Sequence, residues 1–306
     1  MNKKGDDVMK YIKSPLNYTG GKYKLLSQIL PLFPDEIDTF VDLFCGGCNV
    51  GINVDAKRII CNDIESHVVA LLSYFKTIDS DELIKKINEK IIQYGLSDTS
   101  LNGYEFYNTN SSDGVAKYNK DKYLKMRNDY NNNQSDDLMF YMMVIFAFSN
   151  QIRFNKNGLF NMPVNKRDFN DNIKKNTIKF VDKIHNKNIF FTNKDFAVLK
   201  INKLKRNDLV YCDPPYLITC ASYNEQDGWN VQKEKELLNL LDELNNNGIK
   251  FALSNVLENK GNSNDILKEW SKKYTVHYLN NTYGNCNYHA KDKSNNSTVE
   301  VLITNY

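Results

Sequence analysis

The 306-residue sequence has little of what defines several large protein classes. Its 6 cysteines do not indicate a disulfide-built secreted scaffold. Its 14 glycines and 6 prolines exclude a collagen-like or mucin-like composition. The longest apolar run, residues 138–148, is too short to span a bilayer and suits a buried helix. Residues 1–13 are mostly polar and do not resemble a signal segment, so we expect a soluble, cytoplasmic protein.

Residues that bind metals are also scarce. The chain has 4 histidines, no H-x-x-x-H pair and a single C-x-x-C, formed by Cys45 and Cys48. No second cysteine pair follows at zinc-ribbon spacing, so we favour small residues filling a tight turn over a metal or redox site. Cys61 and Cys212 each end an apolar run and are expected to be core thiols. We therefore predict no bound metal.

The net charge of +3 hides an uneven distribution of basic residues. Residues 150–208 contain fourteen Lys and Arg against five Asp and Glu, a local charge of +9, so the rest of the chain carries −6. A basic segment on a nearly neutral protein is typical of a face that binds a polyanion. A solvated, lysine-rich surface is the alternative, and charge alone does not decide between them.

Apolar runs alternate with helical patterns at both ends of the chain, which predicts an α/β domain with a largely parallel, doubly wound sheet. The expected strands are Thr39–Cys45, Arg58–Asn62, Asn188–Thr192, Asp208–Cys212, Ile249–Ser254, Tyr274–Leu279 and Thr298–Thr304. The expected helices among them are Ile64–Thr77, Gln232–Asn247 and Asn264–Lys272.

Residues 79–185 differ, because helical periodicity dominates there. The expected helices are Asp81–Tyr94, Asp121–Tyr130 and Ser135–Ser149, followed by a polar, glycine-containing stretch at Asn155–Asn165. We interpret this region as a mainly helical insertion that carries a basic loop or β-hairpin. Residues 1–78 and 186–306 then form the sheet domain.

The first candidate motif is the run from Phe40 to Asn49, in which an apolar strand leads to Asp42 and then to Gly46-Gly47. A double glycine at the carboxyl end of a strand lets a small cofactor lie against the backbone, although G-x-G-x-x-G spacing is missing. Asp63 ends the next strand, where an acid can accept both hydroxyls of a ribose. A turn and a helix cap are the plain alternatives, and the pair together favours a nucleoside-bearing cofactor.

The second motif, Asp213-Pro-Pro-Tyr216, directly follows an apolar strand. Two prolines end the strand and stiffen the loop. The carboxylate of Asp213 and the carbonyls beside the prolines are acceptors for the N–H bonds of an exocyclic amine, and Tyr216 offers a flat face for its ring. A strand-ending turn with a packed tyrosine is the alternative interpretation, and it explains the prolines but not the whole four-residue motif.

The third motif, Tyr18-Thr-Gly-Gly-Lys22, precedes a helical run from Tyr23 to Leu30 and can hold a carboxylate. In this order the motifs resemble the Dam-type (D12 class) DNA adenine-N6 methyltransferases, and most of all the Dam enzymes of T-even phages. The resemblance covers nearly the whole chain. Its matching pieces are Tyr18-Thr-Gly-Gly-Lys22, Asp42-Leu-Phe-Cys-Gly-Gly47, Asn62-Asp63, Asp195-Phe196, Asp213-Pro-Pro-Tyr216, Ser149-Asn-Gln-Ile-Arg153, Tyr216–Tyr223, Leu253–Glu258 and Leu267–Tyr274.

The resemblance implies a Rossmann-like class I methyltransferase sheet that binds S-adenosylmethionine, with residues 79–185 as the target-recognition domain. It implies methylation of a flipped adenine in duplex GATC sites. The catalytic residues would be Asp213, Pro214, Pro215 and Tyr216. The cofactor would be bound by Tyr18, Lys22, Asp42, Phe44, Gly46, Gly47, Asp63, Asp195, Phe196, Asp213 and Tyr223. The DNA would be bound by Asn17, Arg153, Pro163 and Arg167, with Arg167 reading a guanine.

Partners follow from the same resemblance: duplex DNA in the nucleoid or of a phage, no membrane, and a cognate restriction endonuclease as an open possibility. We expect a monomer, with dimerisation on DNA left open. Asn17 departs from the family, because cellular Dam enzymes have a base-contacting lysine there. The segments Lys194–Asp208 and Asn224–Asn230 are longer than in the phage relatives.

Two other functions stay open on the sequence. One is methylation of another planar amino group: cytosine N4, RNA adenine or a protein amide. The basic insertion disfavours a small or protein substrate. The other is a catalytically dead DNA-binding protein, against which the intact Asp213 and Gly46-Gly47 argue.

Overall fold

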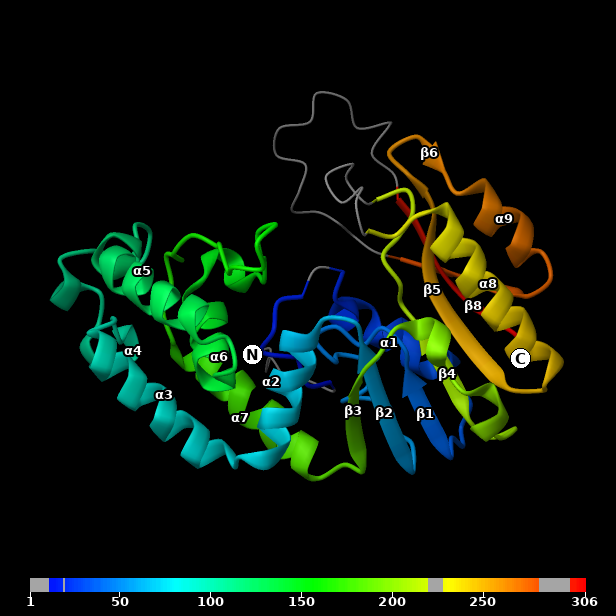
Figure 1. The fold of residues 1–306 in the computed structure, drawn as a ribbon, viewed down its shortest axis with the longest axis horizontal. Coiled ribbons are helices and arrows are strands. Elements are labelled where there is room, and N and C mark those ends of the chain that lie inside the picture. The colour runs from blue at the N-terminus through cyan, green and yellow to red at the C-terminus, as the bar shows by residue number, and fades with distance from the viewer. Residues whose placement is uncertain (1–10, 19, 220–227, 281–297) are drawn as a thin grey trace, which may run out of the picture. The chain divides into compact units, whose positions relative to one another are not determined.

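The computed structural model describes residues 11–18, 20–219, 228–280 and 298–306. The chain divides into two compact units, each made of separate stretches of sequence (Figure 1). We call one the sheet unit; it comprises residues 22–45, 54–64 and 188–306. We call the other the helical unit; it comprises residues 1–21, 46–53 and 65–187.

The strands of the described residues all belong to the sheet unit. They lie in the order β3-β2-β1-β4-β5-β8-β7, and β6 pairs with β5. Strands β1 to β5 are parallel, whereas β8 is antiparallel to both β5 and β7. The predicted α/β architecture with a mostly parallel sheet is confirmed. The strands are β1 (Thr39–Asp42), β2 (Arg58–Asp63), β3 (Ile189–Asn193), β4 (Leu209–Cys212), β5 (Lys250–Asn259), β6 (Asn262–Ser263), β7 (Thr275–Leu279) and β8 (Thr298–Thr304).

Both faces of this sheet are buried, because successive side chains of a strand point to opposite faces. On one face, Val41 and Val210 pack with leucines of α8 and with Trp270 of α9. On the other face, the rings of Phe40 and Tyr211 lie 6.2 Å apart and are stacked. The helices of the unit are η1 (Lys22–Leu25), α1 (Leu26–Ile29), η2 (Leu30–Leu32), η5 (Phe196–Val198), η6 (Ile201–Lys203), α8 (Val231–Asn246) and α9 (Asp265–Ser271), where η marks a 3-10 helix.

The helical unit is built around α6, whose residues from Met139 to Phe146 are all buried. The buried helix expected from the apolar run is therefore confirmed. Helices α2 and α5 pack against α6, and α3 packs against α7 (Figure 1). The helices are α2 (Ser66–Thr77), α3 (Ser80–Tyr94), α4 (Thr99–Asn102), η3 (Glu105–Tyr107), α5 (Ala116–Asn132), α6 (Asp137–Phe146), η4 (Phe148–Asn150) and α7 (Asp171–His185).

Helix α7 is absent from the helices expected on the sequence. Its lysines conceal an amphipathic pattern in which Thr177, Phe180, Val181 and Ile184 are buried. The side chain of Asn170 caps its first turn by accepting hydrogen bonds from two backbone N–H groups. The helical unit also begins before residue 79, because α2 packs on both α6 and α7.

The predicted β-hairpin at 155–165 is only partly formed. Among the described residues of this segment, antiparallel pairing is limited to an isolated bridge between Phe154 and Phe160 and another between Ala147 and Val164. The side-chain oxygen of Asn155 accepts hydrogen bonds from the backbone N–H groups of Asn157 and Leu159. These side-chain bonds close the turn inside two backbone hydrogen bonds that cross it, from the Asn155 N–H to the Leu159 carbonyl over 2.8 Å and from the Asn161 N–H to the Arg153 carbonyl over 3.1 Å.

None of the described helices is both long and apolar enough to cross a membrane.

Candidate active site

The predicted site residues of the sheet unit follow neighbouring parallel strands. Asp42 at the end of β1 is paired with Cys61 of β2 on one side and with Tyr211 of β4 on the other. The loops that follow β1, β2, β3 and β4 therefore leave the same edge of the sheet. In doubly wound folds, this carboxyl edge is where ligands bind.

The Asp-Pro-Pro-Tyr loop after β4 contains a cluster of charged and aromatic side chains. The Nζ atom of Lys22 lies 2.8 Å from Oδ1 of Asp213, and the two side chains are 4% and 17% exposed. The hydroxyl of Tyr216 donates a hydrogen bond to the same Oδ1 over 2.9 Å. The Lys22 ammonium also lies 5.0 Å from the centre of the Tyr216 ring. Lysine, carboxylate and tyrosine therefore hold one another in a fixed arrangement.

A second carboxylate belongs to this cluster. Glu300 of β8 is 2% exposed, and its Oε1 lies 3.7 Å from Nζ of Lys22 and 3.4 Å from the hydroxyl oxygen of Tyr216. The cluster thus places one ammonium between two carboxylates. We call Lys22, Asp213, Tyr216 and Glu300 the tetrad.

Burial shifts the pKa of two members of the tetrad, Asp213 and Tyr216. Burial raises the pKa of Asp213 above the ordinary aspartate value, although the nearby Lys22 ammonium opposes that shift. Burial, with the adjacent charge of Asp213, raises the pKa of Tyr216 well above its ordinary value. Tyr216 is therefore a neutral hydrogen-bond donor near neutral pH. No hydrogen bond reaches Oδ2 of Asp213 from the residues that the structure describes, which leaves this oxygen as an acceptor.

Asn62, just before Asp63, ties two of the site loops to the end of β2. Its side-chain amide donates to the carbonyl of Leu43 over 3.1 Å and to the carbonyl of Lys194 over 2.9 Å. Its side-chain oxygen accepts a 2.9 Å hydrogen bond from Thr192. One buried asparagine thereby fixes the loops after β1 and β3 to the end of β2, where Asp63 is 7% exposed.

Three aromatic rings lie together beyond the same strands. Phe44 lies 5.4 Å from Phe196 and 5.6 Å from Trp229, and Phe196 also lies 5.6 Å from Trp229, measured between ring centroids. The indole N–H of Trp229 donates a 2.6 Å hydrogen bond to Glu234, a fully buried carboxylate of α8. Phe44 and Trp229 are half-buried, so this group offers flat apolar surface to a planar ligand.

The other predicted site residues of the sheet unit differ in their surroundings. The carboxylate of Asp195 accepts a 2.9 Å hydrogen bond from the N–H of Ala197 and caps η5. Asp42 is buried at the end of β1. Pro214 is buried and Pro215 is exposed. Tyr223 lies outside the described residues.

In the helical unit, the double glycine faces residues near the start of the chain. Gly46 has a positive φ of 46°, and a Cβ atom there would lie 2.8 Å from the ring of Tyr18. A Cβ on Gly47 would lie 3.2 Å from the carbonyl of Leu16. Gly46 is therefore needed for the packing of Tyr18, and Gly47 lies in a tight contact with the 14–18 segment.

The predicted DNA-contacting residues also lie in the helical unit, and most of them are engaged within the chain. Asn17 donates a 2.7 Å hydrogen bond to the carbonyl of Ser149, and the Pro163 carbonyl accepts from the N–H of Phe148. Arg153 donates from Nε to the side chain of Asn161 and from NH2 to its carbonyl, over 2.7 and 3.1 Å. Arg153 therefore braces the turn between residues 153 and 161.

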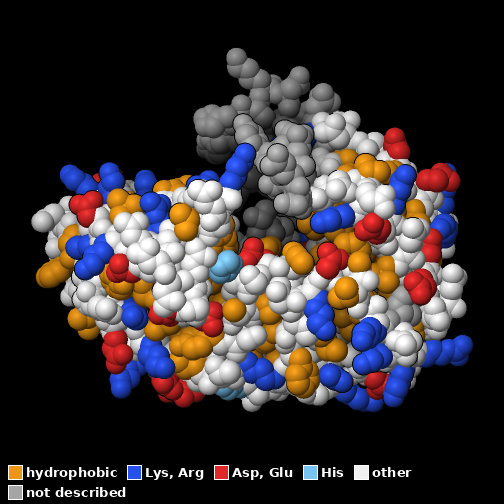
Figure 2. Space-filling view, viewed as in Figure 1, with side chains coloured by type: hydrophobic (Ala, Val, Ile, Leu, Met, Phe, Trp, Pro, Cys, Tyr) orange, Lys and Arg blue, Asp and Glu red, His pale blue; other side chains and the backbone are white. Residues whose placement is uncertain are grey.

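Arg167 differs from the other arginine. It is exposed, and within the described part of the chain no hydrogen bond or ion pair involves its guanidinium. Further basic side chains gather over α5 (Figure 2). The basic segment identified from the sequence, residues 150–208, does not include this helix. Helix α5 has five basic residues and two acidic ones: Lys117, Lys120, Lys122, Lys125 and Arg127, and Asp121 and Asp129.

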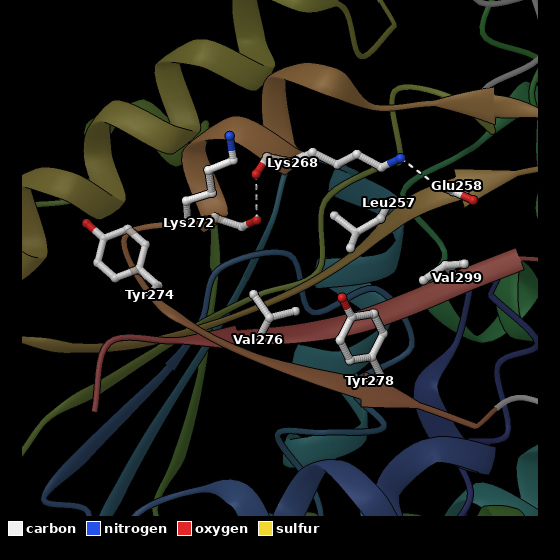
Figure 3. A pocket seen from close by; sticks show the side chains of 9 residues that line it. Leu257, Glu258, Lys268, Lys272, Tyr274, Val276, Tyr278 and Val299 are labelled. Carbon is white, nitrogen blue, oxygen red and sulfur yellow. Dashed lines mark hydrogen bonds and ion pairs between the residues drawn. The ribbon is translucent and has the colours of Figure 1, made fainter.

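A groove in the sheet unit contains none of the predicted site residues. It has a volume of about 530 Å³ and lies among α9, β5, β7 and β8, and Val276, Tyr278, Lys268 and Lys272 are among the side chains that line it (Figure 3). Lys268 is paired with Glu258 there. Among all the described residues, this groove included, no group of three His, Cys, Asp or Glu side chains could hold a metal ion.

Sequence reasoning missed three residues of the site: Glu300, Trp229 and Glu234. Glu300 is an acid on an apolar strand, and that conflict with burial was a usable signal. The same holds for Glu234, which lies among the leucines of α8. Trp229 has no local pattern that distinguishes it.

Comparison with known proteins identifies similar sequences over nearly the whole chain. The family model of the D12 class N6 adenine-specific DNA methyltransferases matches residues 18–285. The chain is 44% identical over 302 residues to a protein named type II methyltransferase M.FokI from Planomicrobium okeanokoites, covering 97% of this chain and 43% of that protein. It is 43% identical to the modification methylase StsI from Streptococcus sanguinis, covering 100% of this chain and 44% of that protein.

A more distant relative is the DNA adenine methylase of Salmonella typhi, which is 23% identical over 278 residues. The match covers 89% of this chain and 88% of that protein. The chain thus spans less than half the length of the two more similar relatives.

Proposed function

The chain belongs to the D12 class N6 adenine-specific DNA methyltransferase family, and we propose that it transfers a methyl group from S-adenosylmethionine to the N6 amine of adenine in duplex DNA. The observation that carries this proposal is the tetrad at the carboxyl edge of the sheet, where Lys22 and Tyr216 orient the carboxylate of Asp213, which is 17% exposed.

Asp213 acts on the amine of the target base. Its Oδ1 is occupied by Lys22 and Tyr216, so Oδ2 accepts an N–H of the amine, and the carbonyl of Pro214 accepts the other. Withdrawal of these hydrogens directs the nitrogen lone pair toward the electrophilic carbon. Lys22 keeps the carboxylate ionised despite its burial. Tyr216 stacks on the base, which offsets part of the few kcal/mol needed to unstack it from the helix.

The cofactor site lies on the same edge, and its residues suit S-adenosylmethionine. Asp63 at the end of β2 accepts from ribose hydroxyls, and the rings of Phe44, Phe196 and Trp229 contact a planar adenine. Asn62 keeps these loops in place. When bound, the cofactor supplies a methyl group already activated on a sulfonium. Tyr18, Gly46, Gly47, Asp42, Asp195 and Tyr223 stay predictions as cofactor ligands.

The helical unit would bind the DNA, and Arg167 would read it. An exposed guanidinium with no partner in the described chain is available for bidentate hydrogen bonds to guanine O6 and N7. We propose GATC as the site, with Arg167 discriminating one of its base pairs. Asn17 and Arg153 donate hydrogen bonds within the protein, and each keeps further side-chain N–H groups with which it would contact the DNA.

The division into a catalytic domain of residues 1–78 and 186–306 and a recognition domain of residues 79–185 is part of the same proposal. The helical unit supports part of this division, because residues 79–185 fall within it, but the same unit also contains residues 1–21, 46–53 and 65–78. Monomeric behaviour and a cognate restriction endonuclease stay predictions, as does the likeness to T-even phage enzymes.

The decisive experiment measures the product. The full chain is incubated with isotopically labelled S-adenosylmethionine and duplex DNA, and the nucleosides are separated by mass spectrometry. We expect N6-methyladenine from the wild type, none above background from Asp213→Asn, and wild-type rates from Asp38→Asn, whose exposed carboxylate lies in the same unit. N4-methylcytosine, or methylation only of RNA or of a protein amide, would refute the proposal.

The recognition site is then read by sequencing methylated DNA from cells that express the protein. Arg167→Ala should raise methylation of sites altered at one base pair relative to the preferred site, because a lost bidentate contact costs about 1–3 kcal/mol of discrimination. The double variant Lys174→Ala and Lys175→Ala is the control. Its loss of phosphate contacts should lower activity on all sites alike, because such contacts carry no sequence information. Equal loss at every site in Arg167→Ala would make this residue a phosphate contact.

A further inference from the structure

Asp168, the residue after Arg167, carries a fully buried carboxylate in the helical unit. Its Oδ2 accepts hydrogen bonds from the Ser97 hydroxyl over 2.7 Å and from the Thr99 backbone N–H over 2.8 Å. Its Oδ1 accepts a third from the Thr99 hydroxyl over 2.7 Å. No ion pair compensates this carboxylate within the described residues, so three neutral donors hold the charge.

The network extends to α5. Ser97 and Asn119 are both fully buried, and they exchange two hydrogen bonds of 2.9 Å each, from Ser97 N to Asn119 Oδ1 and from Asn119 Nδ2 to Ser97 Oγ. Asp168 is thereby joined through Ser97 to a long helix, and through Thr99 to the start of α4. A buried polar network of this kind has one satisfied geometry and rigidifies what it holds.

The backbone on the other side of Arg167 is also fixed. The carbonyl of Lys166 accepts a 2.9 Å hydrogen bond from the N–H of Val115. Gly114 has a φ of 70°, and a Cβ atom there would lie only 2.3 Å from that carbonyl. The two neighbours of Arg167 are therefore anchored, and the exposed arginine side chain projects from a rigid support.

We propose that Asp168 is the positioning residue that sets the direction of Arg167 and so determines sequence discrimination. A buried carboxylate costs desolvation, and a neutral side chain of the same size would fill the space without that cost. Three convergent donors instead fix both its oxygens and the backbone that bears Arg167. Bidentate base contacts need this degree of placement, whereas phosphate contacts do not. The inference rests on the proposed function.

The test compares methylation of the preferred duplex with a duplex altered at the base pair that Arg167 reads, and takes the ratio of kcat/KM as discrimination. Asp168→Asn should lower the ratio about tenfold, within the loss expected for a whole bidentate contact. Thr99→Val removes one donor and spares the carboxylate, so it should give a smaller loss; Thr99→Ser keeps the hydroxyl and should restore the wild-type ratio. Asp182→Asn is the control, because this carboxylate accepts a Ser80 hydroxyl in the same unit at an exposed position.

A double variant separates positioning from simple destabilisation. In an Arg167→Ala background, Asp168→Asn should lower the ratio no further, because its effect passes through Arg167. The proposal is overturned if Asp168→Asn and Thr99→Val slow both duplexes equally, or if the double variant discriminates less than Arg167→Ala alone. It is also overturned if Arg167→Ala leaves the ratio unchanged. In each of these cases, continued formation of N6-methyladenine by the wild type leaves the proposed function standing.

Discussion

Lys22→Met isolates the contribution of the ammonium to the reaction. The variant keeps an unbranched side chain of similar length in a site that is 4% exposed, and it removes the charge that lies 2.8 Å from Asp213. Burial already raises the pKa of Asp213, and the ammonium opposes this shift. Loss of the ammonium should therefore raise that pKa further, so the ionised carboxylate that accepts the amine proton forms only at higher pH.

The magnitude follows from the geometry. A hydrogen bond to a charged group contributes about 1.5–3 kcal/mol, and about 1.4 kcal/mol corresponds to a factor of ten in an equilibrium. The ionised fraction of Asp213, and with it kcat, should fall about ten- to a hundredfold on the acidic side of the profile. At higher pH, where the carboxylate ionises without help, kcat should recover.

The assay is kcat against pH with both substrates saturating, which removes effects of weaker binding from the comparison. Lys57→Met is the matched control: its ammonium also pairs with an aspartate, Asp38, but the two side chains are 77% and 37% exposed. Exposed pairs contribute little, so the control profile should match the wild type. An unchanged acidic limb in Lys22→Met would refute the assignment of Asp213 as the ionised acceptor.

Stability gives the same reasoning a second, independent readout. A carboxyl group whose pKa is raised by folding binds its proton more tightly in the folded state, so the free energy of unfolding falls as the pH rises through the folded pKa. Lys22→Met should extend that fall to higher pH. Urea midpoints should therefore differ most between variant and wild type near neutral pH, and least below the ordinary pKa of aspartate.

Three further outcomes are expected. Gly46→Ala should lower the thermal midpoint, because its Cβ would lie 2.8 Å from the Tyr18 ring at a positive φ and overpacking costs about 1–3 kcal/mol; an unchanged midpoint would show that the ring moves freely. Asp63→Ala should weaken S-adenosylmethionine binding about ten- to a hundredfold in calorimetry, the loss of a charge-assisted hydrogen bond, and equal affinity would leave Asp63 a structural residue. Duplex binding should weaken with salt at a log–log slope of about −0.9 per neutralised phosphate, and a flat response would contradict a DNA substrate.

Helix α7 has a helical pattern of buried residues that its many lysines made difficult to recognise in the sequence. Its buried positions recur with helical spacing, and Asn170 is a conventional cap. No helix is predicted for residues 171–185 from the sequence, because lysines are frequent among the apolar positions of the segment. The turn at 155–165 lies where a loop or β-hairpin is predicted, but the sequence pattern does not record the hydrogen bonds that the Asn155 side chain accepts from backbone N–H groups.

The sequence by itself determined the strands, the buried α6 and the position of two of the motifs directly after strands β1 and β4. These features depend on periodicity and on residues that end strands, which are local properties. Only the tertiary structure decided that Lys22 meets Asp213, that Glu300 joins them, that Asn62 ties the loops together, and that Asp168 anchors the segment of Arg167. These contacts join residues far apart in the chain, and the order of strands in the sheet brings most of them together. A buried charge is stable only where its partners converge, and that convergence is set by packing rather than by neighbours in sequence.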